Sequence, residues 1–169
     1  MLAATERTIR ATGAVSPPTL FALRQDRVIG MVITRPFYKG EDAIMAVLDL
    51  ATLPMACNAD CVVITWEKSD NISALGGPQL PVQGMEMCVA TRTEHWYSFT
   101  PVLVGVATSG DIVVRWEPAT PWDRDADLPP PFKELLTLCW LQEWQLSLEE
   151  TCAHMEENGF LVSLTAEPT

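Results

Sequence analysis

The sequence predicts an α+β protein, with a mainly antiparallel mixed sheet, one early helix, and a C-terminal helical pair packed on one face of the sheet. Three observations support this prediction. Short runs of β-branched and apolar residues recur along the chain between turn residues. One segment in the first half and two near the end show apolar residues at helical spacing instead. The expected order is β-β-α-β-β-β-β-α-α-β, with about five to seven strands.

The chain begins with a segment that shows no sustained periodicity. Residues 1–19 mix charged residues with Thr and Ala, and they include two consecutive prolines. We therefore expect a mobile N-terminal arm, followed by one α+β domain over residues 20–169. At the start of this domain, the runs LFALR and VIGMVIT flank the polar pair Gln25-Asp26. This pattern predicts a β-hairpin over residues 20–34.

The early helix is expected over residues 39–57. Acidic residues occupy its first turn, where the helix dipole favours negative charge. Apolar residues then recur at helical spacing, namely Ile44, Val47, Leu48 and Ala51. Pro54 is expected to kink or end the helix. The short run CVVITW at residues 61–66 is rich in β-branched residues, which favours a central strand.

The middle of the chain predicts further strands after a long loop. Residues 68–84 hold three glycines and two prolines among polar residues, and a loop of this length is often functional. Strands are expected over residues 85–92, 100–107 and 111–117. The last two are joined across residues 108–110 as a hairpin, so the sheet is predicted to be antiparallel.

The last quarter of the chain predicts the helical pair. A proline-rich surface crossing precedes a helix expected over residues 132–145. Ser147 followed by Glu150 forms a capping-box pattern that begins a second helix, and Gly159 is expected to end it. The run FLVSL at residues 160–164 then predicts a short strand that returns to the sheet.

Charge is distributed unevenly along the chain. The first 40 residues hold six basic and two acidic groups, whereas the other 129 hold five basic and twenty acidic groups, and the net charge is −11. Direct nucleic-acid binding is not expected, because it depends on Lys and Arg side chains that neutralise phosphates. The acidic composition is typical of a soluble protein and also suits a basic partner surface.

The five cysteines and the apolar runs bear on the compartment. An odd number of cysteines, four of them within apolar segments, argues against a disulfide framework. No apolar run approaches the roughly 20 residues of a membrane-spanning helix, and charged residues interrupt the start of the chain where a secretion signal would be apolar. We expect a cytoplasmic protein with no membrane contact.

Two groups of residues resemble metal sites without meeting their requirements. An EF-hand-like spacing is formed by Asp123, Asp125, Asp127 and Glu134. Leu128 stands where that loop needs glycine, and three prolines follow it. Two close pairs of potential zinc ligands are formed by Cys57, Cys61, Cys152 and His154. Neither pair has the usual zinc-knuckle spacing, so we expect no metal and no cofactor.

His95 is the candidate ligand-pocket residue. It lies among acidic, hydroxyl and aromatic residues in the stretch Arg92-Thr93-Glu94-His95-Trp96-Tyr97-Ser98. A histidine in this setting can act as a general base, although a polar hairpin tip explains the same residues. Phosphate-binding glycine loops, a nucleophile elbow and an HExxH pair are absent from the sequence. We therefore assign no catalytic residue and do not expect an enzyme.

Trp140 and Trp144 are the candidate interface residues. They are predicted to lie one turn apart on the helix over residues 132–145, which carries apolar residues around nearly its whole circumference. Such a helix needs cover on most sides, either from the rest of the domain or from a second chain.

These observations favour a non-enzymatic interaction or assembly module that binds a protein partner or itself. The first alternative is a small-molecule-binding domain or enzyme, with a pocket near the 68–84 loop and His95. The second alternative is an acidic inhibitor that mimics nucleic acid and blocks a basic binding site.

Overall fold

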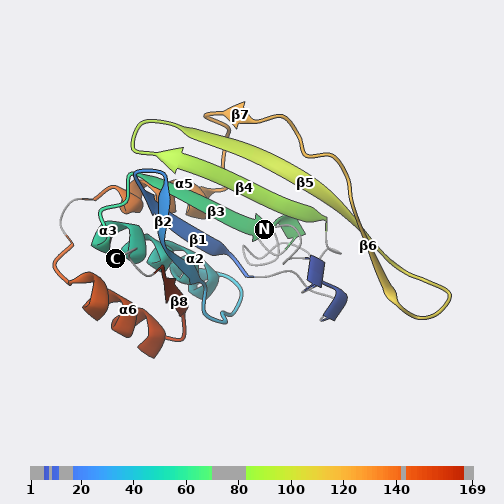
Figure 1. The fold of residues 1–169 in the computed structure, drawn as a ribbon, viewed down its shortest axis with the longest axis horizontal. Helices are drawn as coiled ribbons and strands as arrows, with labels where there is room; N and C mark the ends of the chain where they lie inside the picture. The colour runs from blue at the N-terminus through green and yellow to red at the C-terminus, as the bar shows by residue number, and fades with distance from the viewer. Residues whose placement is uncertain (1–5, 8, 12–16, 70–82, 142–143, 166–169) are drawn as a thin grey trace.

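The computed structural model of this chain describes residues 6–7, 9–11, 17–69, 83–141 and 144–165 (Figure 1). Its strands are β1 (Thr19–Arg24), β2 (Arg27–Ile33), β3 (Cys61–Glu67), β4 (Gly84–Thr91), β5 (His95–Val106), β6 (Ile112–Trp116), β7 (Asp123–Arg124) and β8 (Leu161–Leu164). Its helical elements are α2 (Glu41–Leu48), the 3₁₀ turn η1 (Asp49–Ala51), α3 (Thr52–Ala56), α5 (Pro130–Cys139) and α6 (Leu148–Glu157).

The described strands form one sheet in the order β6-β5-β4-β3-β1-β2-β8, with β7 paired to β5 outside this path. Every pairing between neighbouring strands is antiparallel. The predicted α+β class and its order of elements are therefore confirmed, with β7 as an additional short strand and the early helix divided into three pieces.

The predicted hairpin over residues 20–34 is present as β1 and β2. Its two turn residues, Gln25 and Asp26, both have left-handed backbone, with φ of 51° and 60°. Two consecutive residues in this conformation match the right-handed twist of the flanking strands, which is why a two-residue loop suffices. The sheet continues directly from β1 to β3, so the predicted central strand lies inside the sheet.

The early helix follows the prediction over residues 39–57 but is interrupted. α2 leads into the 3₁₀ turn η1, and α3 contains Pro54 at its third position. Asp42 accepts hydrogen bonds from the side chain of Arg35 at 2.5 Å and from the backbone N–H of Tyr38 at 2.7 Å, which ties the start of α2 to the preceding loop. Asn58, with φ of 50°, ends the helical region.

The predicted helix over residues 132–145 is corrected by the structure. α5 begins at Pro130, where a proline at the first helical position loses no hydrogen bond, and it ends at Cys139. The backbone of Trp140 has left the helical conformation, and Trp144 lies outside the helix. The exposed residues Lys133, Glu134 and Thr137 give α5 a polar side. The helix is amphipathic, not apolar all round.

The predicted capping box is present at the start of α6. Ser147 Oγ accepts the backbone N–H of Glu150 at 3.2 Å, and the Glu150 carboxylate accepts the backbone N–H of Ser147 at 2.9 Å. Gly159, with φ of 87°, follows the helix and turns the chain towards β8. The final strand returns to the sheet, as the sequence predicted, and the structure shows that it pairs with β2.

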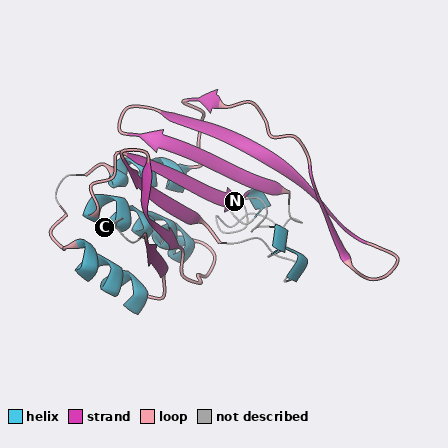
Figure 2. Cartoon of the chain, viewed as in Figure 1, coloured by secondary structure: helices cyan, strands magenta, loops and turns pink. Residues whose placement is uncertain are grey.

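The main core lies between the sheet and its helices, which share one face of the sheet (Figure 2). Leu20, Ile64 and Trp66 contribute from the strands, and Phe132 and Leu135 contribute from α5; all are at most 1% exposed. The rings of Trp66 and Phe132 are stacked, with 3.9 Å between centroids and 17° between planes. This contact fixes α5 across the middle of the sheet.

A second, smaller core lies where β5 and β6 leave the rest of the sheet. Ile9, which is fully buried, packs with Met85, Val102 and Val114. The described part of the predicted N-terminal arm is therefore attached to the sheet at this point. Mobility of residues 1–19 stays a prediction.

Candidate functional site

His95 lies in a cleft between the β4–β5 turn, the segment after β7 and α5. The cleft has a volume of about 420 Å³. His95 is the first residue of β5, so the structure places it beside the polar hairpin tip that the sequence indicated. The opposite wall is formed by Lys133, Leu136, Thr137 and Trp140. His95 and Trp140, the two candidate residues from separate hypotheses, thus line the same cleft.

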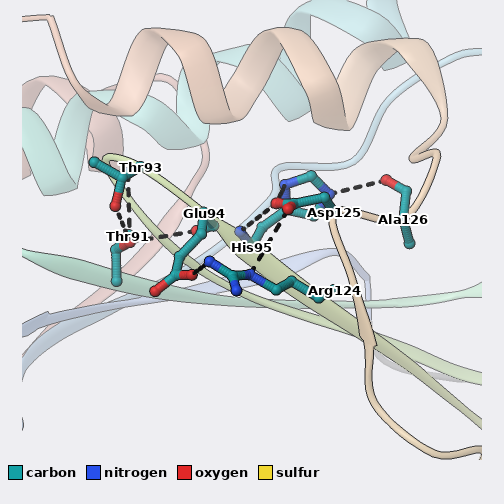
Figure 3. Close-up of polar contacts among 7 residues, drawn as sticks. All are labelled: Thr91, Thr93, Glu94, His95, Arg124, Asp125 and Ala126. Carbon is teal, nitrogen blue, oxygen red and sulfur yellow. Dashed lines mark hydrogen bonds and ion pairs between the residues drawn. The ribbon is translucent and has the colours of Figure 1, made fainter.

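The His95 ring fastens the segment after β7 to the sheet (Figure 3). Its Nε2 is 2.9 Å from the carbonyl oxygen of Ala126, and its Nδ1 is 3.9 Å from Asp125 Oδ1. The backbone N–H of Asp125 donates to the carbonyl of His95 at 2.9 Å. Both ring nitrogens therefore face groups of this chain. These contacts suit a structural role for His95 better than the role of a general base.

Several other charged groups around this cleft are paired with one another, and Arg92 also lines it. Arg124 forms an ion pair with Glu94, as Figure 3 shows. Lys133 Nζ is 2.6 Å from Asp127 Oδ1, and this contact lowers the pKa of the Asp127 carboxyl below its usual value. Because opposite charges alternate along the rim, the cleft has no wall of a single sign to attract a charged ligand.

The two candidate interface tryptophans do not form one helical patch. Trp140 is half-buried against the main core, at the end of α5. Trp144 is also half-buried, and its indole Nε1 donates to Thr151 Oγ1 of α6 at 2.8 Å. The chain leaves the helix at Cys139 so that Trp144 reaches α6. The predicted spacing of one helical turn between these residues is therefore wrong, whereas their role in an interface stays a prediction.

The thiols and carboxylates offer no described metal site. In the part of the chain that the structure describes, no three His, Cys, Asp or Glu side chains are grouped to hold a metal ion. All five cysteines are free thiols. Burial raises the pKa of Cys57 to about 11 and the pKa values of Cys88 and Cys139 to about 12. These three thiols are neutral near pH 7 and are weak nucleophiles.

Two buried carboxylates, those of Glu86 and Glu67, were not identified from the sequence. Glu86 accepts hydrogen bonds from Trp66 Nε1 and from Tyr97 Oη, the latter at 2.6 Å. Burial, together with this bond to Glu86, raises the pKa of Tyr97. Glu67 accepts the backbone N–H of Gly84 at 3.0 Å at the base of the long loop. Each carboxylate holds neighbouring elements together. The mostly apolar sequences of β3 and β4 gave no sign of these partners.

The largest feature that sequence reasoning missed is the far end of the β5–β6 hairpin, here called the arm and defined as residues 102–116. β4 pairs with β5 only as far as Pro101, and beyond that point β5 is paired with β6 among the described strands. The arm therefore projects past the sheet as a two-stranded ribbon (Figure 1). Gly84 marks the junction, since a Cβ there would lie 2.3 Å from the carbonyl oxygen of Thr100.

The arm exposes apolar side chains on both of its faces. Val104 and Val106 lie on the side that Ile9 covers at its base, yet they are 41% and 74% exposed. Leu103 and Val113, on the other side, are 55% and 46% exposed. A signal for this feature was present, because the chain carries no charge from Pro101 to Ser109 and the strand lacks the alternating polar side of a half-covered sheet.

A third surface lies on the sheet face opposite the helices. Val89 and Trp96, which are paired across β4 and β5, form an apolar hollow with Trp122 that has a volume of about 380 Å³. Trp122 is 52% exposed. The prediction that the 68–84 loop borders a ligand pocket falls largely on residues 70–82, which lie outside the described residues.

Comparison with known proteins gives no relative of this chain. It matches no protein-family model, no curated protein sequence and no solved structure. In the described residues, no helix has the length and apolar character needed to cross a membrane.

Proposed function

We propose that this protein is a non-enzymatic interaction or assembly module, and that the arm is its contact element. The observation that supports this proposal is the exposure of Leu103, Val104, Val106 and Val113 on a ribbon of two strands. Partner chains are the usual cover for such side chains, because exposed apolar surface on a protein marks an interaction site when it gathers on one element.

The stability of the ribbon gives a second argument. An isolated two-stranded hairpin is marginally stable in water, and about three strands or a packed layer are needed to stabilise it. Ile9 covers the base of the arm at Val102 and Val114, whereas Leu103, Val104, Val106 and Val113 stay at least 41% exposed. A bound polypeptide supplies both the missing strand and the missing apolar contacts.

The arm replaces the tryptophan pair as the preferred contact element. Trp140 and Trp144 are each half-buried against their own chain, whereas Leu103, Val104, Val106 and Val113 of the arm are exposed. The acidic body, with a net charge of −11 for the chain, suits a polypeptide partner better than a nucleic acid. Five free cysteines agree with a reducing compartment, and we place the module in the cytoplasm.

The proposal is tested by native mass spectrometry of the protein as purified from a cell extract. We expect the wild type to carry a second polypeptide, either another copy or a different chain. The double variant L103S/V106S is expected to lose it. The matched control is L161S/L164S, which changes two exposed leucines of the opposite edge strand β8. A bare wild-type monomer, or equal loss in both variants, would contradict the proposal.

The second candidate function is binding of a small molecule in the cleft that His95 and Trp140 line. A volume of about 420 Å³ lies within the range of small-ligand sites. A ligand found by a thermal-shift screen should raise the melting temperature of the wild type and lose this effect in Arg92→Ala, since Arg92 lines the cleft. Arg27→Ala, on β2, is the control. An equal shift in both variants places the ligand elsewhere.

A further inference from the structure

We propose that the occupant of the arm is a second copy of this chain, paired antiparallel along β6 about a two-fold axis that passes beside Val113. This inference rests on the proposed function, because it names the partner of the same surface. A strand at the end of a sheet presents unpaired N–H and C=O groups, and pairing with another strand satisfies them. β6 ends the strand order of the sheet at this side.

The hydrogen bonds of the arm show which groups of β6 face outward. The backbone N–H of Glu117 donates to Pro101 O at 3.0 Å, and that of Ala107 donates to Asp111 O at 2.9 Å. In an antiparallel pair these inward bonds alternate along the strand, so the backbone groups of Ile112, Val114 and Trp116 point away from β5. The side chain of Arg10 bonds Ile112 O from outside at 3.1 Å, in agreement with this alternation.

The side chains of β6 and its flanks then select the register. Pairing about Val113 sets Arg115 of each copy opposite Asp111 of the other. Pairing about Val114 sets Glu117 opposite Asp111, and pairing about Arg115 sets two arginines opposite each other. Opposite charges across strands stabilise a sheet and like charges destabilise it. The charge pattern of this edge therefore favours the register about Val113 for a second copy of the same chain.

This register also brings apolar side chains of β6 together, while Leu103, Val104 and Val106 on β5 lie outside the pairing. Ile112 of one copy stands opposite Val114 of the other, and the two Val113 side chains meet at the axis. Two marginal ribbons become one ribbon of four strands, with the order β5-β6-β6-β5 across the pair. The proposed pairing requires the Arg10 side chain to move, because the guanidinium and the second strand approach Ile112 O from the same side of β6.

Cysteine crosslinking tests the register directly. The two Val113 positions form a non-hydrogen-bonded pair in this arrangement, with Cα atoms about 4.5 Å apart, which is within disulfide reach. We expect V113C to form a covalent dimer on mild oxidation, and V114C and R115C to form much less. V106C is the control, because Val106 is more exposed but lies on β5, away from the axis. Equal crosslinking in V106C, or stronger crosslinking in V114C or R115C, would overturn the proposed pairing.

Charge exchange supplies a test that does not depend on introduced thiols. Sedimentation velocity should show a dimer of the wild type. The affinity of this dimer should fall about tenfold in D111R and in R115D, which corresponds to a loss of about 1.4 kcal/mol of binding free energy over the two symmetric contacts. The double variant D111R/R115D should regain most of the affinity. Failure of the double variant to regain affinity would overturn the register.

The two proposals can fail separately. A wild type that binds a different polypeptide, loses it in L103S/V106S, and shows no self-association would overturn the second-copy inference and leave the interaction module standing. A wild type that stays a bare monomer under all conditions would overturn both.

Discussion

β5 runs through the body of the sheet and through the arm, and the exposure of its side chains differs between these two regions. In the body of the sheet, this strand buries the polar residues Ser98 and Thr100, which are 6% and 9% exposed. In the arm, the same strand exposes Leu103 and Val106, which are more apolar. In the body, β4 pairs with β5 on one side and β7 pairs with its residues Trp96 and Tyr97 on the other. In the arm, β6 is its one paired strand among the described residues. Burial here follows the number of neighbours and not the hydropathy of the residue.

This difference indicates that the two regions serve different purposes. The body closes its core with helices on one face and holds Glu86 inside by hydrogen bonds to Trp66 and Tyr97. Val102 and Val114 of the arm pack with Ile9 in the second core, whereas Leu103, Val104, Val106 and Val113 gain stability only when another surface covers them. Substitutions in the body should therefore change folding, and substitutions in the arm should change association.

The largest expected effect comes from a matched pair of leucines. Leu135→Ala removes a fully buried side chain of α5 and should lower the free energy of unfolding by about 2 to 5 kcal/mol. Leu103→Ala, at a site that is 55% exposed, should change it by less than about 0.5 kcal/mol. Urea denaturation of dilute protein measures both. Similar losses in the two variants would mean that the arm belongs to the folded core.

Alkaline pH should weaken the body through its buried thiols. Cys57, Cys88 and Cys139 have raised pKa values in the folded state, so folding holds their protons. Their contribution is complete below the unfolded pKa near 9 and is lost as pH rises towards the folded values, by about 1.4 kcal/mol per pH unit for each thiol.

The variant Cys88→Ala should flatten this dependence. The urea midpoint should fall less steeply between pH 8 and 11 for Cys88→Ala than for the wild type. Each midpoint is compared with the midpoint of the same protein at pH 8. The arm contains no cysteine, so L103S/V106S should keep the wild-type slope. An identical slope in Cys88→Ala would show that this thiol does not retain its proton through burial.

The smallest effect concerns the capping box of α6. Ser147→Ala removes the side-chain acceptor for the backbone N–H of Glu150 and should cost about 1 kcal/mol. Because α6 covers the body and lies away from the arm, the sedimentation coefficient should not change (Figure 1). Thr93→Ala, an exposed substitution in the β4–β5 turn, is the control for the thermal measurement. A change of association in Ser147→Ala would show that α6 and the arm are coupled.

Local patterns in the sequence were sufficient for most of the elements. Three elements depend only on neighbours within a few residues, so short-range sequence patterns predict them. They are the Gln25-Asp26 turn, the strand at residues 61–66 and the capping box at Ser147. The helix over residues 132–145 was drawn too long. It ends at Cys139, and Trp144 beyond it donates a hydrogen bond to Thr151 of α6, a contact that apolar spacing alone does not predict.

The candidate sites were harder to predict, for the same reason. His95 was correctly placed at a hairpin tip, but its partner Ala126 is 31 residues away and became visible only when the segment after β7 returned to β5. Glu86 is the one charged residue of the mostly apolar strand β4, and its burial depends on α5 crossing that part of the sheet.

By itself, the sequence determined the α+β class, the order of the elements, their turns and caps, and the uneven charge, because these depend on composition and short-range spacing. The tertiary structure alone decided which residues are covered. The pairing of β4 with β5 extends only to Gly84 and Pro101, whereas β5 continues beyond this point paired with β6. An apolar stretch whose sequence is typical of a core strand therefore becomes an exposed arm. Burial is a property of what lies beside a strand, and that is settled by contacts between residues far apart in the chain.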